Sequence, residues 1–184
     1  SMEGNSEDKV SDGSFDHLID ELVKFVGDHP KHPFLIRIGY EFDGSWNKYD
    51  PKNFKLAFQR IVKKLRAAKL SNFSTVYASS SGAKPEDFIN YDPGPEYYEW
   101  VGYSWWGGDK DGQSALDFAR KVKKPVFIAE ATPRGYFLDK EDPDEVCMQE
   151  CLRDTQETYH WSLTSKRGTS LRSGMLHSTT GFLP

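Results

Sequence analysis

Apolar residues recur along this chain with two different periods, and the two periods alternate. Between residues 15 and 26 the large apolar residues return every three or four positions, which predicts an amphipathic helix with Ser14 as its N-cap. A nearly continuous apolar run follows over residues 33–40, bounded by Pro and Gly. A run of this kind is typical of a strand buried on both faces, as in a parallel sheet.

The clearest helix begins after Asp50, which is expected to cap it, with Pro51 in the first helical position. Its apolar residues form one stripe as far as Ala68, while Lys and Arg occupy the other face. The stretch from Gly82 to Pro95 is rich in Gly and Pro and predicts turns. Further strands are predicted over 73–79, 100–104 and 125–129, and further helices over 113–122 and 143–160.

The alternation of strands and helices predicts an α/β fold with right-handed βαβ units and a parallel sheet. Residues 1–13 are polar and lack periodicity, so they are predicted to form a disordered lead-in. Residues 162–184 are rich in Ser, Thr and Gly and predict an irregular tail without a convincing strand. One domain is therefore expected over residues 14–161.

Composition excludes several classes of partner and adds one suggestion. The 184 residues carry a net charge of −4 and contain no apolar run of membrane-spanning length, so neither a nucleic-acid nor a membrane partner is expected. Cys147 and Cys151 lie four residues apart without a second ligand pair nearby, which favours ordinary thiols over a metal site. No metal or cofactor is predicted. Aromatic residues make up 14% of the chain, enough for flat surfaces on which sugars or peptides stack, although most such rings fill cores.

Polar and aromatic side chains follow the predicted strands at their carboxyl ends, where parallel α/β folds collect their reactive groups. Glu41 follows the first strand and Glu130 the fourth, 89 positions later, a separation of about three βα units of about thirty residues each. Both carboxylates are therefore expected on the same rim of the sheet. A protonated and an ionised carboxyl facing each other are what glycoside hydrolysis requires. A solvated or salt-bridged surface acid is the alternative for either Glu alone. The other strand-end residues are Asp43, Ser79 to Ser81, Tyr103, Trp105, Trp106 and Arg134.

Three segments resemble motifs of one enzyme group. Residues 37–46, RIGYEFDGSW, resemble the fourth-strand motif of the clan A glycoside hydrolases, which are retaining (β/α)8 enzymes, and resemble most the mannanase-like family 26 branch. Residues 124–131, KPVFIAEA, are similar to the seventh-strand motif, and residues 101–106, VGYSWW, resemble the sixth strand. The order and spacing of the three motifs agree with the family, and together they span residues 33–135.

The resemblance implies roles for individual residues. Glu41 would be the general acid/base and Glu130 the nucleophile, with Tyr103 as the orienting partner of the nucleophile. Arg37 would lie one layer inside the barrel mouth, either holding carboxylates ionised or forming a structural ion pair.

The same resemblance implies contacts with the sugar. Tyr40 stands where the clan usually has Asn and the mannanase branch has His, so the sugar contact at this position is altered. Asp43 is expected to offer the sugar hydroxyls a polar contact instead. The candidates for stacking on sugar rings are Trp46, Trp105 and Trp106.

The chain matches only the fourth to seventh strands of such a barrel, which when complete takes about 250 residues. The expected fold is therefore a partial (β/α)8 TIM barrel. Its open edges predict self-association, or a second chain that completes the barrel. The expected function is that of an endo-β-glycanase, a retaining hydrolase of a β-linked polysaccharide of the mannan or glucan type. The alternative is a catalytically impaired fragment that binds carbohydrate or acts as a scaffold. By resemblance, a secreted or extracellular location is expected.

Overall fold

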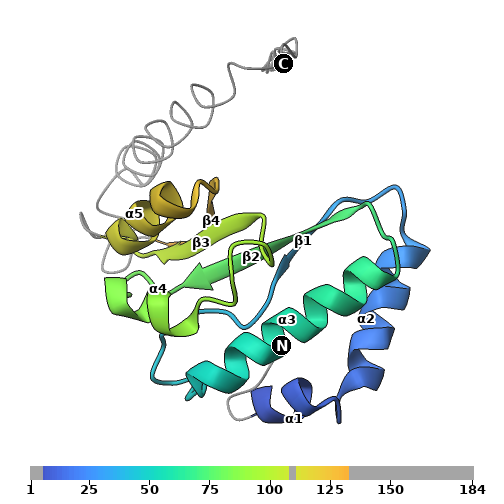
Figure 1. Cartoon of the computed structure of the whole chain (residues 1–184). Helices are drawn as coiled ribbons and strands as arrows, with labels where there is room; N and C mark the ends of the chain where they lie inside the picture. The colour runs from blue at the N-terminus through green and yellow to red at the C-terminus, as the bar shows by residue number, and fades with distance from the viewer. Residues whose placement is uncertain (1–5, 108–110, 133–184) are drawn as a thin grey trace, which may run out of the picture.

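The computed structural model describes residues 6–107 and 111–132 of the chain. Figure 1 shows α2 and α3 side by side, with α4 and α5 near the β3 and β4 end of the sheet. The elements in chain order are α1 (Glu7–Asp12), α2 (Asp16–Asp28), β1 (Phe34–Arg37), α3 (Pro51–Ala67), β2 (Phe73–Ser79), α4 (Pro85–Tyr91), β3 (Trp100–Trp105), α5 (Gln113–Val122) and β4 (Val126–Ala131).

The four strands form one parallel sheet in the order β1-β2-β3-β4. Each strand is hydrogen-bonded to the next one along the chain, with helices in the connections. This is the arrangement of consecutive units of a (β/α)8 barrel, so the predicted partial barrel is confirmed. The helix that the sequence predicts over 143–160, the tail over 162–184 and the two cysteines lie outside the described residues.

The longest helix, α3, forms as the sequence predicts. The carboxylate of Asp50 accepts a hydrogen bond from the backbone N–H of Asn53 at 2.8 Å, and Pro51 occupies the first helical position. The apolar stripe of α3 packs into the core, where Phe54 and Phe58 are fully buried. The expected cap of α2 is wrong, because Phe15 occupies the N-cap position and the N–H of Ser14 instead bonds the carboxylate of Asp12.

The predicted disorder of residues 1–13 is wrong for the described part of that segment, because α1 is a helix packed against α3. Val10 is 5% exposed and joins the core, and the carboxylate of Glu7 accepts the backbone N–H of Asp50 at 2.8 Å. One apolar residue defines no helical periodicity, so the sequence pattern does not predict α1. The contact of α1 with α3 is what stabilises this short helix.

The turn-rich interpretation of the stretch from Gly82 to Pro95 is wrong for residues 85–91, which form α4. Pro85 begins the helix, the carboxylate of Asp87 accepts the N–H of Lys84 at 2.9 Å, and Phe88 is fully buried. Proline in the first helical position followed by an acid two residues later is a helix-start signal, so Pro85 begins a helix here rather than a turn.

The outer strands are less covered than the inner ones. β2 and β3 are mostly buried, whereas Leu35 in β1 is 51% exposed and β4 is only partly buried. The prediction that the first strand is buried on both faces is therefore wrong for the described residues, in which β1 has a neighbouring strand on one side alone.

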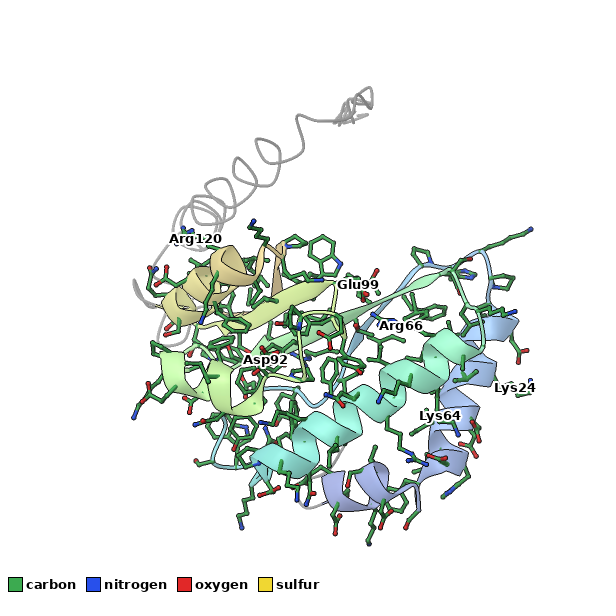
Figure 2. The ribbon with its side chains drawn as sticks, in the orientation of Figure 1. Lys24, Lys64, Arg66, Asp92, Glu99 and Arg120 are labelled. Atoms are coloured by element: carbon green, nitrogen blue, oxygen red, sulfur yellow. The ribbon has the colours of Figure 1, made fainter. Side chains whose placement is uncertain are left out.

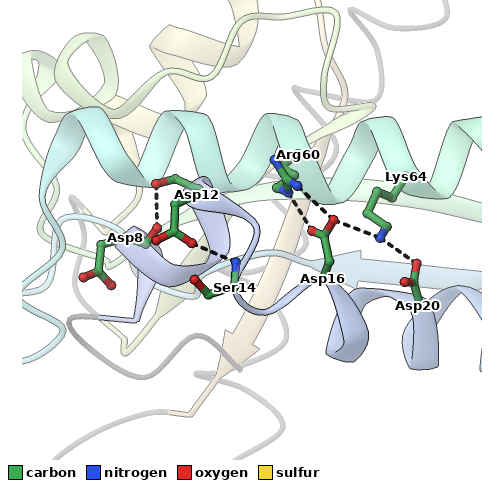
Figure 3. A network of polar contacts seen from close by, with 8 residues as sticks. Asp8, Asp12, Ser14, Asp16, Asp20, Arg60 and Lys64 are labelled. Atoms are coloured by element: carbon green, nitrogen blue, oxygen red, sulfur yellow. Dashed lines mark hydrogen bonds and ion pairs between the residues drawn. The ribbon is translucent and has the colours of Figure 1, made fainter.

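Ion pairs join the helices on the outside of the fold. Arg60 and Lys64 of α3 both contact the carboxylate of Asp16 in α2, at 2.6 and 3.3 Å, and Lys64 also reaches Asp20 at 2.7 Å (Figure 3). The hydrogen bond from Arg60 lowers the pKa of Asp16 to about 2. Figure 3 thus shows a charged seam that fixes α2 along α3.

A second polar link fixes α3 to the sheet. Arg66 of α3 donates to the carboxylate of Glu99, which precedes β3, at 3.0 Å (Figure 2). Although partial burial acts in the opposite direction, hydrogen bonds from the N–H and hydroxyl of Thr75 and from Arg66 lower the pKa of Glu99.

None of the described helices is long and apolar enough to cross a membrane.

Candidate active site

Side chains along β3 alternate between the two faces of the sheet. Gly102 and Ser104 face away from the helices, which in a barrel is the inside. A Cβ on Gly102 would lie only 2.8 Å from Cγ1 of Val76, so glycine relieves crowding on this inner face. The β3 side chains on the helix-facing side belong to the hydrophobic core and are Val101, Tyr103 and Trp105.

An irregularity in β4 decides where Glu130 points. Tyr103 pairs with Ile128, but the next residue of β3, Ser104, pairs with Glu130, so Ala129 is the extra residue of a β-bulge. In a regular strand Glu130 would share the helix-facing side with Ile128. The bulge instead turns the carboxylate of Glu130 to the inner face, beside Ser104.

Arg37 connects Glu130 to the first strand. β1 and β4 are the outermost strands of the described sheet, yet Nη2 of Arg37 lies 2.6 Å from Oε1 of Glu130. The guanidinium also lies 5.4 Å from the ring centre of Tyr40, within range of a cation–π contact. The ion pair therefore crosses the inner face and draws the carboxylate of Glu130 toward the strand that leads into Glu41.

Glu41 lies in the turn that directly follows β1. Its φ of +45° is a left-handed conformation that is uncommon for a residue other than glycine, and its side chain is 6% exposed. The next residue, Phe42, is 1% exposed, stacks on Tyr77 with ring centres 4.2 Å apart, and donates its N–H to the carbonyl of Ala78 at 3.3 Å. The core thus fixes the turn immediately after Glu41.

A hollow of about 370 Å³ opens among the segments that follow β1, β2 and β3, and Glu41 lines it. Asp43 also lines the hollow, and its carboxylate accepts hydrogen bonds from the backbone N–H of Ser80, at 2.7 Å, and from the Ser80 hydroxyl. Two indole rings complete the lining: Trp46 is 58% exposed and Trp106 is half-buried. A carboxyl group, a fixed acceptor and aromatic rings around one hollow suit a ligand with a hydroxylated ring.

The structure does not bring every predicted residue to this hollow. Trp105 is 1% exposed within the core, so it offers no ring face to a sugar, and its expected stacking role is wrong. Tyr103 also lies on the helix-facing side, where a Cβ on Gly112 would come within 2.2 Å of its ring. Because Glu130 is on the opposite face, this geometry does not support Tyr103 as its orienting partner. Glu130 and Arg37 themselves lie outside the lining of the hollow.

Two residues contribute to the site in ways that the sequence does not reveal. Ser80 is one of the predicted strand-end residues, but its bond to Asp43 could not be predicted. Asn47 bonds the carbonyls of Tyr40 and Glu41 from within an unremarkable polar run. Among the described residues, no cluster of three or more His, Cys, Asp and Glu side chains is arranged to hold a metal ion.

Several solved structures that resemble this one are mannanases, some of them described as family 26 enzymes. The catalytic domain of a family 26 endo-β-1,4-mannanase from Bacillus sp. JAMB-750 superimposes with a TM-score of 0.63 at 14% identity, covering 79% of this chain and 44% of that one. A Bacillus subtilis mannanase gives a TM-score of 0.61 at 15% identity, covering 78% and 45%. The fold that the resemblance to family 26 of clan A implies is therefore confirmed. The match covers less than half of each of these two enzymes, so the described sheet corresponds to part of their barrel rather than to all of it.

Two curated proteins have a higher sequence identity to this chain than those structures, and they are xylanases rather than mannanases. The chain is 30% identical over 145 residues to a β-1,3-xylanase from Alcaligenes sp. The aligned part covers 75% of this chain and 30% of that protein. The chain is also 28% identical over 172 residues to a β-1,3-xylanase from Vibrio sp., and this alignment covers 88% of this chain and 37% of that protein. The chain therefore spans about a third of the length of the curated relatives it matches. No family model matches the chain.

Proposed function

We propose that this chain carries the catalytic carboxylates of a retaining glycoside hydrolase that cleaves a β-linked polysaccharide. In this proposal Glu41 is the general acid/base and Glu130 the nucleophile. The observation that carries it is the bulge in β4, because it turns Glu130 to the inner face of the sheet, where Arg37 holds it. A bulge that re-aims one carboxylate toward the barrel interior is typical of a functional site.

The proposed reaction is a double displacement. Glu41 donates its proton to the glycosidic oxygen while the carboxylate of Glu130 attacks the anomeric carbon, so the glycosidic bond breaks and an ester to Glu130 forms. Glu41, now ionised, then takes a proton from water, and the water oxygen attacks the same carbon and releases Glu130. Two inversions restore the original anomeric configuration.

The hollow supports the sugar-binding part of the proposal. Trp46 exposes its ring beside Glu41, and Asp43 keeps free lone pairs while Ser80 fixes its orientation. We therefore assign Asp43, Trp46 and Trp106 to sugar contact, with Tyr40 at the edge of the same turn. We place β-1,3-xylan first among the substrates, because the curated relatives of higher identity are β-1,3-xylanases, with β-mannan second because the structural neighbours are mannanases.

The test measures new reducing ends after the full chain is incubated with β-1,3-xylan, β-1,4-mannan and β-1,3-glucan. Activity should fall by at least about 1,000-fold in Glu130→Gln and by about 100- to 10,000-fold in Glu41→Gln. Glu21→Gln is the matched control, since Glu21 is exposed on α2, and it should leave the rate unchanged. Full activity in Glu130→Gln would refute the assignment of the nucleophile.

Two further readouts separate the alternatives. NMR of the first product should show the β-anomer before it equilibrates, and an α-anomer would exclude the double displacement. Saturable binding of these polysaccharides without any new reducing ends would instead favour the carbohydrate-binding alternative.

A further inference from the structure

Asn47 makes an unusual pair of contacts behind the proposed acid/base. Its side chain is buried, and its Nδ2 donates to the carbonyl of Tyr40 at 3.0 Å and to that of Glu41 at 2.9 Å. The N–H of Gly44 donates to the carbonyl of Glu41 as well, at 2.8 Å. One amide group therefore clamps the two peptide units that flank the Cα of Glu41.

The clamped turn is conformationally costly. Gly39 and Glu41 both have positive φ, +60° and +45°, within three residues. Glycine tolerates such a value, whereas for Glu41 the Cβ makes it unfavourable. A residue stays in this region only where its surroundings over-determine it.

The surroundings on the other side of Glu41 are apolar. The ring of Phe42 is stacked on Tyr77 in the core, and its N–H is bonded to Ala78. The core therefore fixes the residue after Glu41, and the amide of Asn47 fixes the peptide units on either side of it. Without the amide, the carbonyl of Glu41 would keep its bond from Gly44 but that of Tyr40 would lose the bond from Asn47, so the backbone of Glu41 could relax toward negative φ and move its carboxyl group.

We propose that Asn47 is a positioning residue that holds the backbone of Glu41 in its left-handed conformation and so aims the acid/base into the hollow. The catalytic part of this inference rests on the function proposed above. The conformational part stands on the contacts of Asn47 alone and has its own test.

The conformational test is a double-mutant cycle on the unfolding midpoint. Asn47→Ala should lower the midpoint in the wild-type background. It should lower it by clearly less in a Glu41→Gly background, because glycine adopts a φ of +45° without a clamp. Equal losses in the two backgrounds would refute the link between Asn47 and the conformation of Glu41.

The catalytic test exploits the dependence of acid catalysis on the leaving group. When a polysaccharide is cleaved, the departing sugar oxygen must be protonated. Dinitrophenolate departs without a proton, so cleavage of a dinitrophenyl glycoside of the same sugar does not need the acid. Asn47→Ala should therefore lose about 100-fold in kcat on the polysaccharide and less than about threefold in the glycosylation rate of the dinitrophenyl substrate. Glu41→Ala serves as the reference for complete loss of the acid.

Controls keep the outcomes distinct. Asn90→Ala, an exposed asparagine on α4, should match the wild type in every assay. Equal losses of Asn47→Ala on both substrates would overturn the positioning role and indicate general damage. A wild-type chain that cleaves neither substrate would overturn the proposed function and the catalytic role of Asn47 together. The unfolding cycle would still test whether Asn47 holds the backbone conformation of Glu41.

Discussion

Phe42 links the core to the proposed acid/base, so its truncation should be costly. The ring is 1% exposed and lies against four other aromatic rings, with ring centres at 4.2 Å for Tyr77, 5.2 Å for Phe88, 5.5 Å for Tyr91 and 6.1 Å for Phe54. Phe42→Ala removes all of these contacts and leaves a cavity in a packed cluster.

The expected loss for Phe42→Ala is about 4 kcal/mol of unfolding free energy. Core Phe→Ala changes cost roughly 3–5 kcal/mol, and the stacked pair with Tyr77 keeps this site above the lower end of that range. Such a loss corresponds to roughly 10–20 °C in Tm for a domain of this size. Phe42→Leu keeps most of the volume and should cost about 1.5 kcal/mol.

Urea unfolding followed by tryptophan fluorescence measures these losses. Phe25→Ala is the control, because the Phe25 ring is 53% exposed on α2, and it should cost less than about 1 kcal/mol. If Phe42→Ala cost no more than Phe25→Ala, the ring would not anchor the Glu41 turn, and the argument that the core fixes that turn would fail.

Three further predictions concern other parts of the fold. Deleting Ala129 should remove the bulge and place Glu130 directly after Ile128 in a regular strand, so Glu130 should still face inward and hydrolysis should persist while circular dichroism shows a folded chain; loss of hydrolysis in a folded chain would contradict this account of the bulge. Because the pKa of Asp16 is lowered from 3.8 to about 2 by Arg60, its contribution to stability should be complete above about pH 5 and vanish as the pH falls through 2. The urea midpoints of wild type and Asp16→Asn should therefore differ at neutral pH and converge in acid, and a gap that does not change with pH would refute this. Finally, self-association through the exposed edge at β1 should appear in light scattering and weaken in Leu35→Lys, whereas a monomer stable to dilution and concentration would exclude it.

Local signals explain the parts of the fold that the sequence predicted well. Asp50 and Pro51 mark the start of α3, and β2 and α5 occupy their predicted residues because their periodicity and flanking residues agree. The α1 helix was missed because its one buried apolar residue, Val10, depends on a contact with α3 far along the chain. Its stability is a property of the packed pair rather than of the segment.

The site was harder to predict than the fold, for a reason that concerns single residues. The positions of Glu41 and Glu130 at strand ends follow from chain order, but the direction of each side chain does not. Simple alternation would have put Glu130 on the wrong face, and it gave no sign that Trp105 is a core residue. The bond from Ser80 to Asp43 joins residues 37 positions apart and has no local pattern. Long-range contacts and one-residue irregularities therefore decide the site.

The bulge in β4 also makes the strand sensitive to parity. The bulge takes up Ala129 between Ile128 and Glu130, so losing that residue together with the bulge leaves the faces of everything that follows unchanged. Adding or removing one residue in the regularly paired part of the strand would instead exchange the two faces. An engineer who transfers this strand into another barrel must therefore count residues as even or odd before considering which residues they are. In that count Ala129 is left out, because it is the one residue of the strand that has no partner position of its own in β3.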